Sequence, residues 1–132
     1  MEITVSREQG RVPITVFHVR GDINMATSDE LQRQVRQAFE DGMRDLVLDL
    51  SDVPYMSSAG IRALNDMFRL LRGSSPAESD DAVKKGLSDG TFKSLHLKLV
   101  NPNRHVQEVL GMSGVDMFLE IHRNVKDAVA SF

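Results

Sequence analysis

The chain has 132 residues, 41% of which are hydrophobic, and a formal net charge of −3 at pH 7. This length suits a single domain spanning 1–132, and the apolar content is enough to form its core. The negative charge argues against a direct nucleic acid partner, because binding a phosphate backbone needs clustered Lys and Arg. The sequence contains no cysteine, which excludes disulfides, thiolate metal sites and cysteine nucleophiles.

The histidines and the first residues of the chain argue against a metalloprotein, a secreted protein and a membrane protein. His18, His96, His105 and His122 are scattered without the spacing of metal ligands, so we expect no metal and no other cofactor. The first residues have neither the basic start nor the apolar block of a signal peptide, and no apolar run approaches the roughly 20 residues of a membrane span. We therefore expect a cytoplasmic protein that does not insert into a membrane.

Alternating apolar residues between 3 and 16 predict a β-hairpin with its turn at 8–11 and one face buried. Thr27 and Glu30 then form a capping box, in which Thr27 accepts from the backbone of the first helical turn and Glu30 reaches back. The helix that follows carries an apolar stripe, and Gly42 is its expected end.

The next run, 46–50, is nearly all apolar, which is typical of a central strand covered on both faces. A loop with Pro54 follows it. Apolar residues then recur every three or four positions from Ile61 to Leu71, which predicts an amphipathic helix that begins near Ala59. One face of this helix packs on the sheet, and the other is free for solvent or a partner.

Residues 73–94 form a predicted insertion. Their composition shifts toward Ser, Asp, Gly and Lys, which indicates a segment peripheral to the core. Residues 75–78 repeat the capping-box pattern, so a short helix and a linker both remain open for this segment.

The last part of the chain completes the fold pattern. Alternation at 95–99 predicts a strand, Asn101-Pro102 caps the next helix, 117–121 is the last strand, and Asn124 begins a closing helix. This order of elements predicts an α/β fold. We expect a mixed sheet with a parallel core, an N-terminal β-hairpin and about four main helices.

The loop after the run 46–50 presents two adjacent hydroxyls, Ser57 and Ser58. Serine is a favoured N-cap residue, so helix capping explains both on structural grounds alone. A helix start also has unpaired N–H groups and a partial positive charge, so it tolerates an added negative group. The two interpretations are compatible if Ser57 caps the helix and Ser58 points outward. Both residues lie beyond the carboxyl end of a strand, where α/β sheets place ligand and partner sites.

Three segments of the chain together resemble the STAS domain family, which is shared by sulfate transporters and anti-sigma factor antagonists. They are the turn 20–24, the segment Tyr55-Met56-Ser57-Ser58-Ala59-Gly60-Ile61, and the segment 101–115. The resemblance is greatest to the stand-alone bacterial antagonists. It implies that Ser58 is the phosphorylated serine, while Ser57 and Asn24 occupy positions where many relatives carry aspartate.

The resemblance implies a binding switch with no catalysis of its own. Its expected partner is an anti-sigma factor that is also an ATP-dependent serine kinase; the unphosphorylated chain binds this protein and so releases a sigma factor. Phosphorylation of Ser58 by the same kinase ends the binding, and a serine phosphatase restores it. The expected partner-binding residues are Asp22, Asn24, Met56, Ser57, Ser58, Ala59, Gly60 and Arg62.

Two other functions compete with this one. The leading alternative is a non-catalytic STAS scaffold module in a stress-signalling or lipid-transport complex, without a kinase. Catalysis is disfavoured, because Ser58 does not lie in a Gly-x-Ser-x-Gly elbow and the chain has neither a Gly-rich phosphate loop nor an HExxH motif. A catalytic His or Asp brought to a serine only by the fold stays open.

Overall fold

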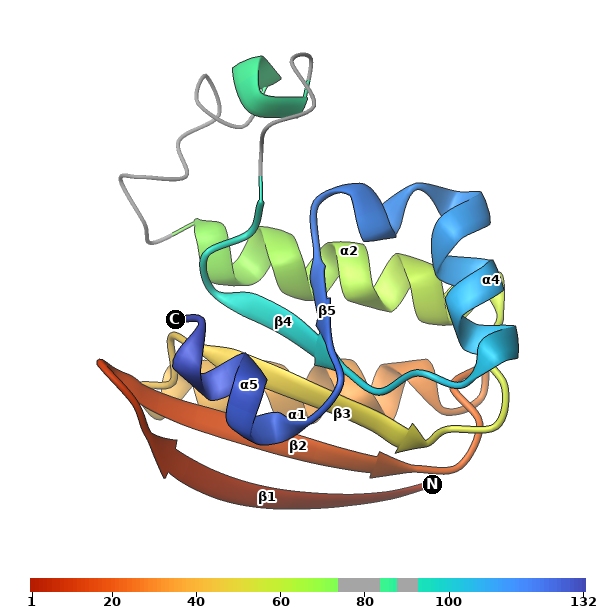
Figure 1. Cartoon of the computed structure of the whole chain (residues 1–132). Helices are drawn as coiled ribbons and strands as arrows, with labels where there is room; N and C mark the ends of the chain where they lie inside the picture. Colours follow the sequence, from red (N-terminus) through yellow and green to blue (C-terminus); the bar gives the residue numbers. More distant parts are fainter. Residues whose placement is uncertain (74–83, 88–92) are drawn as a thin grey trace.

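The computed structural model describes residues 1–73, 84–87 and 93–132. In this part the chain forms one five-stranded sheet in the order β1-β2-β3-β4-β5. The strands are β1 (Glu2–Gln9), β2 (Pro13–Arg20), β3 (Leu46–Asp52), β4 (Leu97–Val100) and β5 (Glu120–His122). The helices labelled in Figure 1 are α1 (Ser28–Glu40), α2 (Ser58–Arg72), α4 (Arg104–Ser113) and α5 (Val125–Ala130), and a short 3₁₀ helix, η2, spans Val115–Met117.

The sheet is mixed, which confirms the predicted fold class. β1 and β2 form the antiparallel hairpin, while β2, β3, β4 and β5 run parallel. Helices α1, α2 and α4 cover one face of the sheet, and α5 lies on the other face (Figure 1). Among the described residues, no helix is long and apolar enough to cross a bilayer.

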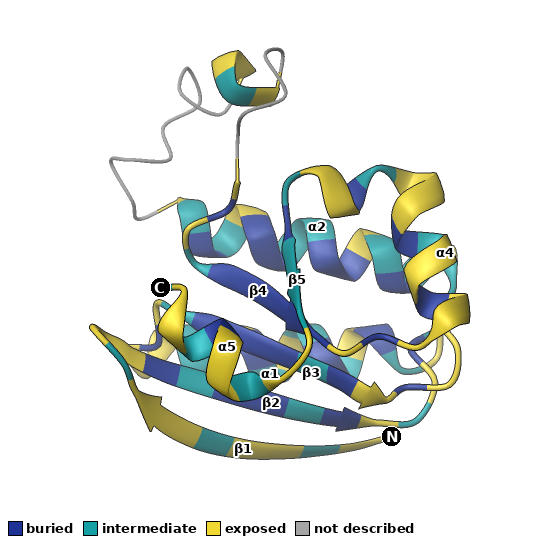
Figure 2. Ribbon diagram, viewed as in Figure 1, coloured by how far each residue is buried: buried dark blue, intermediate teal, exposed yellow. Residues whose placement is uncertain are grey.

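Strand β3 is buried on both faces, as its apolar run predicted. Leu46, Leu48 and Leu50 belong to the larger core, which includes residues of α1, α2 and α4. Val47, between them, packs with Ala128 of α5 in a smaller cluster on the other face. Figure 2 shows β3 and β4 largely buried and the edge strand β1 largely exposed, so the core lies under the centre of the sheet.

The start of α1 lies where it was predicted, but the prediction of a capping box there is wrong. Thr27 has helical backbone angles, with φ −110° and ψ −19°, and its side chain makes no cap bond to the helix. Its hydroxyl instead donates to the carbonyl of Asp22 at 2.7 Å. Asn24 closes the turn, since its side-chain oxygen accepts from the backbone N–H groups two and three residues later at 2.9 and 3.2 Å. Glu30 accepts from side chains further along the helix rather than reaching back.

The predicted cap of the third long helix is also displaced. Asn103, not Asn101, is the N-cap of α4, and its side-chain oxygen accepts from the N–H of Val106 at 2.8 Å. Asn101 has a φ of 50°, a left-handed conformation that asparagine tolerates, and so it turns the chain before the helix begins. The turn at Asn101 thus shifts the start of the helix, so that Asn103 is the cap.

The last strand is shorter than the predicted range 117–121. Gly114 ends α4 with a φ of 79°, and η2 follows it directly. The chain therefore completes a tight turn before it reaches the sheet, and β5 begins only at Glu120. Other predicted boundaries are confirmed: Gly42 follows the end of α1 with a φ of 111°, and Asn124 caps α5. Most of the predicted insertion 73–94, including the capping pattern at 75–78, lies outside the described residues.

Candidate functional site

The two serines of the β3–α2 loop differ in their roles at the start of α2. Ser57 is the N-cap; it has an extended backbone, with φ −92° and ψ 179°, and its hydroxyl oxygen accepts from the N–H of Ala59 at 3.2 Å. Ser58 is the first helical residue and is exposed, whereas Ser57 is half-buried. The loop that carries them runs up the right-hand side of Figure 1, at the carboxyl ends of the parallel strands. One serine thus caps the helix, and the other is presented to solvent.

The loop after β2 is joined to this loop by backbone hydrogen bonds. The N–H of Ile23 donates to the carbonyl of Tyr55 at 3.0 Å, and the N–H of Ser57 donates to the carbonyl of Ile23 at 2.9 Å. Ile23 and Met56 thereby form an isolated parallel bridge that continues the pairing beyond the strand ends. The turn containing Asp22 and the start of α2 therefore form one rigid surface.

Gly60 allows α2 to approach this bridge closely. A Cβ atom at Gly60 would lie 2.5 Å from Cγ of Met56 and 3.1 Å from the carbonyl oxygen of Ile23. Met56 and Ile23 have exposed fractions of 1% and 0%. Met56 and Gly60 therefore support the predicted partner surface from within, and their side-chain positions are not accessible to a partner in this conformation.

Helix α4 holds the β3–α2 loop from its other side. The side-chain amide of Asn103 donates to the carbonyls of Val53 and Pro54 at 3.3 and 3.1 Å. The ring of Tyr55 stacks on the ring of His105, with centroids 5.1 Å apart and planes 15° from parallel. Sequence reasoning missed both contacts, because they join residues about 50 positions apart and no local pattern reports them.

The exposed part of the site is smaller than the predicted set and contains apolar residues that sequence reasoning missed. The predicted residues divide into exposed (Asp22, Ser58, Arg62), half-buried (Asn24, Ser57, Ala59) and buried (Met56, Gly60). Two large apolar side chains in the same loops are also accessible, since Met25 is 82% and Tyr55 45% exposed. The sequence does carry a signal for Met25, because it is an apolar residue in a polar turn and belongs to none of the predicted apolar helix stripes.

The start of α2 is suited electrostatically to a negative group. Its first turn contains no acidic residue, and the exposed Arg62 lies one turn after Ser58. The N–H groups of a first helical turn carry a partial positive charge. Among the described residues, no group of three or more His, Asp or Glu is arranged to hold a metal ion.

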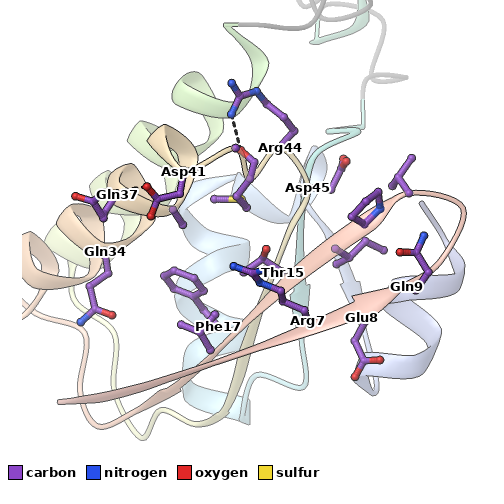
Figure 3. Close-up of a pocket in the computed structure, with 17 residues that line it drawn as sticks. Arg7, Glu8, Gln9, Thr15, Phe17, Gln34, Gln37, Asp41, Arg44 and Asp45 are labelled. Carbon is purple, nitrogen blue, oxygen red and sulfur yellow. Dashed lines mark hydrogen bonds between the residues drawn. The ribbon is translucent and has the colours of Figure 1, made fainter.

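A groove of about 820 Å³ lies at the opposite end of the sheet, between the β1–β2 hairpin and the end of α1 (Figure 3). Phe17, Gln34, Gln37 and Arg44 are among the residues that line it. None of the predicted site residues belongs to this lining. The groove is therefore separate from the surface around Ser58.

Comparisons with known proteins agree with this architecture. The family model described as the STAS domain matches residues 5–74. The search of curated proteins gave no match.

Solved structures of anti-sigma factor antagonists have a similar fold. A Thermotoga maritima protein described as such an antagonist is 17% identical with a TM-score of 0.73, over 98% of this chain and 92% of that one. An antagonist from Mycobacterium paratuberculosis is 20% identical with a TM-score of 0.67, over 98% and 93%. The Bacillus cell fate determinant SpoIIAA, in its phosphorylated form, is 14% identical with a TM-score of 0.62, over 98% of both chains. At these identities the likeness shows the fold.

Proposed function

This chain belongs to the STAS domain family, and we propose that it is an anti-sigma factor antagonist whose binding is switched by phosphorylation of Ser58. The observation that carries the proposal is the placement of Ser58, exposed at the first position of α2 while its neighbour Ser57 caps the helix. The similar fold of SpoIIAA, solved in both unphosphorylated and phosphorylated forms, supports it.

The partner is an anti-sigma factor with serine kinase activity, and its binding surface on this chain surrounds Ser58. Asp22 and Arg62 supply charges, while Met25 and Tyr55 supply exposed apolar area. Met, Tyr and Arg are enriched in protein interfaces relative to the rest of the surface. The hydrogen bonds between the loops hold this surface in one conformation, so little conformational entropy is lost on binding.

Phosphorylation acts on the interface and leaves the fold intact. A phosphoserine carries roughly −1.5 to −2 charges at pH 7. The start of α2 accepts this charge, and Arg62, four residues later, is spaced to pair with it along the helix. A partner packed over Ser58 must instead desolvate the phosphate, which is unfavourable. The phosphorylated chain is therefore released, and a serine phosphatase returns it to the binding form.

The chain performs no catalysis in this switch and acts in the cytoplasm, where kinase, phosphatase and sigma factor meet. The purified chain, used as bait in an extract of its own cells, should retain the anti-sigma kinase. With ATP, that kinase should modify Ser58, as mapped by mass spectrometry, and the modified chain should dissociate.

Variants of the two serines separate the switch from a scaffold role. Ser58→Ala should bind the kinase and resist phosphorylation, and Ser58→Asp should fold but bind about tenfold or more weakly, since the partner must bury its charge. Ser57→Ala, the control, should keep at least part of its phosphorylation. If Ser58 stays unmodified, or if the phosphorylated chain binds as tightly as before, the scaffold alternative replaces the switch.

A further inference from the structure

A chain of hydrogen-bonded polar residues crosses three neighbouring strands on the sheet face that carries α5. The hydroxyl oxygen of Ser6, on β1, lies 3.0 Å from Nε2 of His18, on β2. Nδ1 of His18 lies 2.8 Å from Oδ2 of Asp49, on β3. These residues lie 12 and 31 positions apart in the sequence, so only the sheet brings them together.

Asp49 is held in its ionised form. Burial raises the pKa of Asp49, but hydrogen bonds from the hydroxyl and N–H of Ser51 and from His18 lower it by more, and the net pKa lies below its usual value. The other carboxylate oxygen, Oδ1, accepts two hydrogen bonds from Ser51. The hydroxyl of Ser51 donates to it at 2.6 Å, and the N–H of Ser51 donates to it at 3.0 Å. A carboxylate so placed accepts a hydrogen bond from the N–H at Nδ1, which leaves the lone pair of the imidazole on Nε2, facing Ser6.

We propose that Ser6 is an activated nucleophile, with His18 as its general base and Asp49 as the positioning residue, and that it accepts acyl groups from small activated esters. The order and distances are those of a serine–histidine–aspartate relay, which is recognised by its geometry rather than by its fold. This reactivity is separate from the switch at Ser58 and does not depend on the proposed function.

The step balances without any further reactant. The hydroxyl oxygen of Ser6 attacks the ester carbonyl carbon and forms a new C–O bond, while its proton passes to Nε2 of His18. The bond to the leaving alcohol breaks, and the leaving oxygen takes that proton from His18. The products are acyl-Ser6 and the free alcohol.

The site is accessible but shallow, which restricts the substrate class. The side chain of His18 is 38% exposed, and Ser6 is half-buried. Because β1 lies at the edge of the described sheet, one side of Ser6 is open to an approaching substrate. None of Ser6, His18 and Asp49 lines the groove of Figure 3, so the groove does not enlarge the site. An ester with a good leaving group is therefore the suitable substrate.

The test uses p-nitrophenyl acetate on the purified full chain, with acetylation mapped by mass spectrometry over time. Ser58 is the internal control, because it is an exposed serine of the same chain that lies outside the relay. Ser6 should be acetylated about 100-fold faster than Ser58, the factor typical of a positioned general base. This comparison is made within the wild-type chain, so it does not require any variant to fold.

Variants then assign the roles. His18→Gln should reduce the rate at Ser6 to that of Ser58, Asp49→Asn should reduce it in part, and Ser6→Ala should remove the modification. Circular dichroism checks that each variant is folded. Equal rates at Ser6 and Ser58 in the wild-type chain, or an unchanged rate at Ser6 in a folded His18→Gln chain, would overturn the proposal.

Discussion

Neighbouring residues at the start of α2 perform different physical tasks. The extended backbone of Ser57 directs its hydroxyl to the N–H of Ala59, while Ser58 has already entered the helix and is exposed. A modification of Ser58 therefore alters the surface without removing the cap. Gly60, two residues later, sets how closely the helix approaches the loop after β2.

Ser57→Ala should lower the free energy of unfolding by about 1 kcal/mol, the usual cost of losing an N-cap hydroxyl. Chemical denaturation measures this cost. Ser58→Ala is the matched control, and it should change stability by less than half as much because its hydroxyl is not the cap. An equal loss in both variants would contradict the division of roles between the serines.

Gly60→Ala should destabilise the fold by about 1–3 kcal/mol, because its Cβ would overlap Met56 and meet the backbone of Ile23. Gly111→Ala, within α4, is the control. Its Cβ would lie at an ordinary 3.4 Å from Asp116, and alanine is the better helix former, so this change should be neutral or stabilising by up to about 1 kcal/mol. Thermal or denaturant unfolding of both variants compares them directly.

At the scale of elements, the site depends on α4 as well as on α2. Asn103 uses its oxygen to cap α4 and its amide nitrogen to bind two carbonyls of the β3–α2 loop. One side chain thus joins a helix start to the loop that carries Ser58. The stacking of Tyr55 on His105 adds a second link between the same elements.

Asn103→Ala should cost about 1 kcal/mol of cap energy and should also increase amide hydrogen exchange in the loop 53–57. Asn124→Ala is the matched control, since Asn124 caps α5 through the N–H of Asp127 and does not touch that loop. A similar loss of stability without faster exchange at 53–57 is expected for the control. If Asn103→Ala leaves exchange there unchanged, the loop is held by its other contacts.

At the scale of the whole molecule, the two ends and two faces of the sheet carry different features. The surface around Ser58 lies at the carboxyl ends of the parallel strands, and the groove lined by Phe17 and Gln34 lies at their other end. The relay of Ser6, His18 and Asp49 crosses the α5 face. The sheet therefore separates the proposed switch from the proposed reactive serine.

The ionised Asp49 links global stability to pH. Its pKa is lowered in the folded chain, so its contribution to stability is complete above its unfolded pKa and is lost as pH falls through the folded pKa. Asp49→Asn should therefore be less stable than the wild-type chain at pH 6. The difference in free energy of unfolding should shrink progressively below about pH 4. A difference that stays constant from pH 6 to pH 2.5 would show that the charge of Asp49 does not stabilise the fold.

The sequence by itself determined the main elements and the position of the proposed switch. Alternation placed the hairpin, the apolar run 46–50 placed the central strand, and the spacing from Ile61 to Leu71 placed the helix after the serines. These are local patterns, because hydrophobic periodicity follows directly from the geometry of strands and helices. The cap by Ser57 was predictable for the same reason, since a cap bond spans only a few residues.

Tertiary structure alone decided the contacts between distant residues. It placed Asn103 on the loop carbonyls, buried Met56 beneath the surface that it was expected to form, and aligned His18 between Ser6 and Asp49. It also left Thr27 at the N-cap position of α1 without a cap bond, because the Thr27 hydroxyl takes part in the preceding turn and donates to the carbonyl of Asp22. Strand register and helix packing bring such residues together, and neither is encoded in the spacing of a single segment.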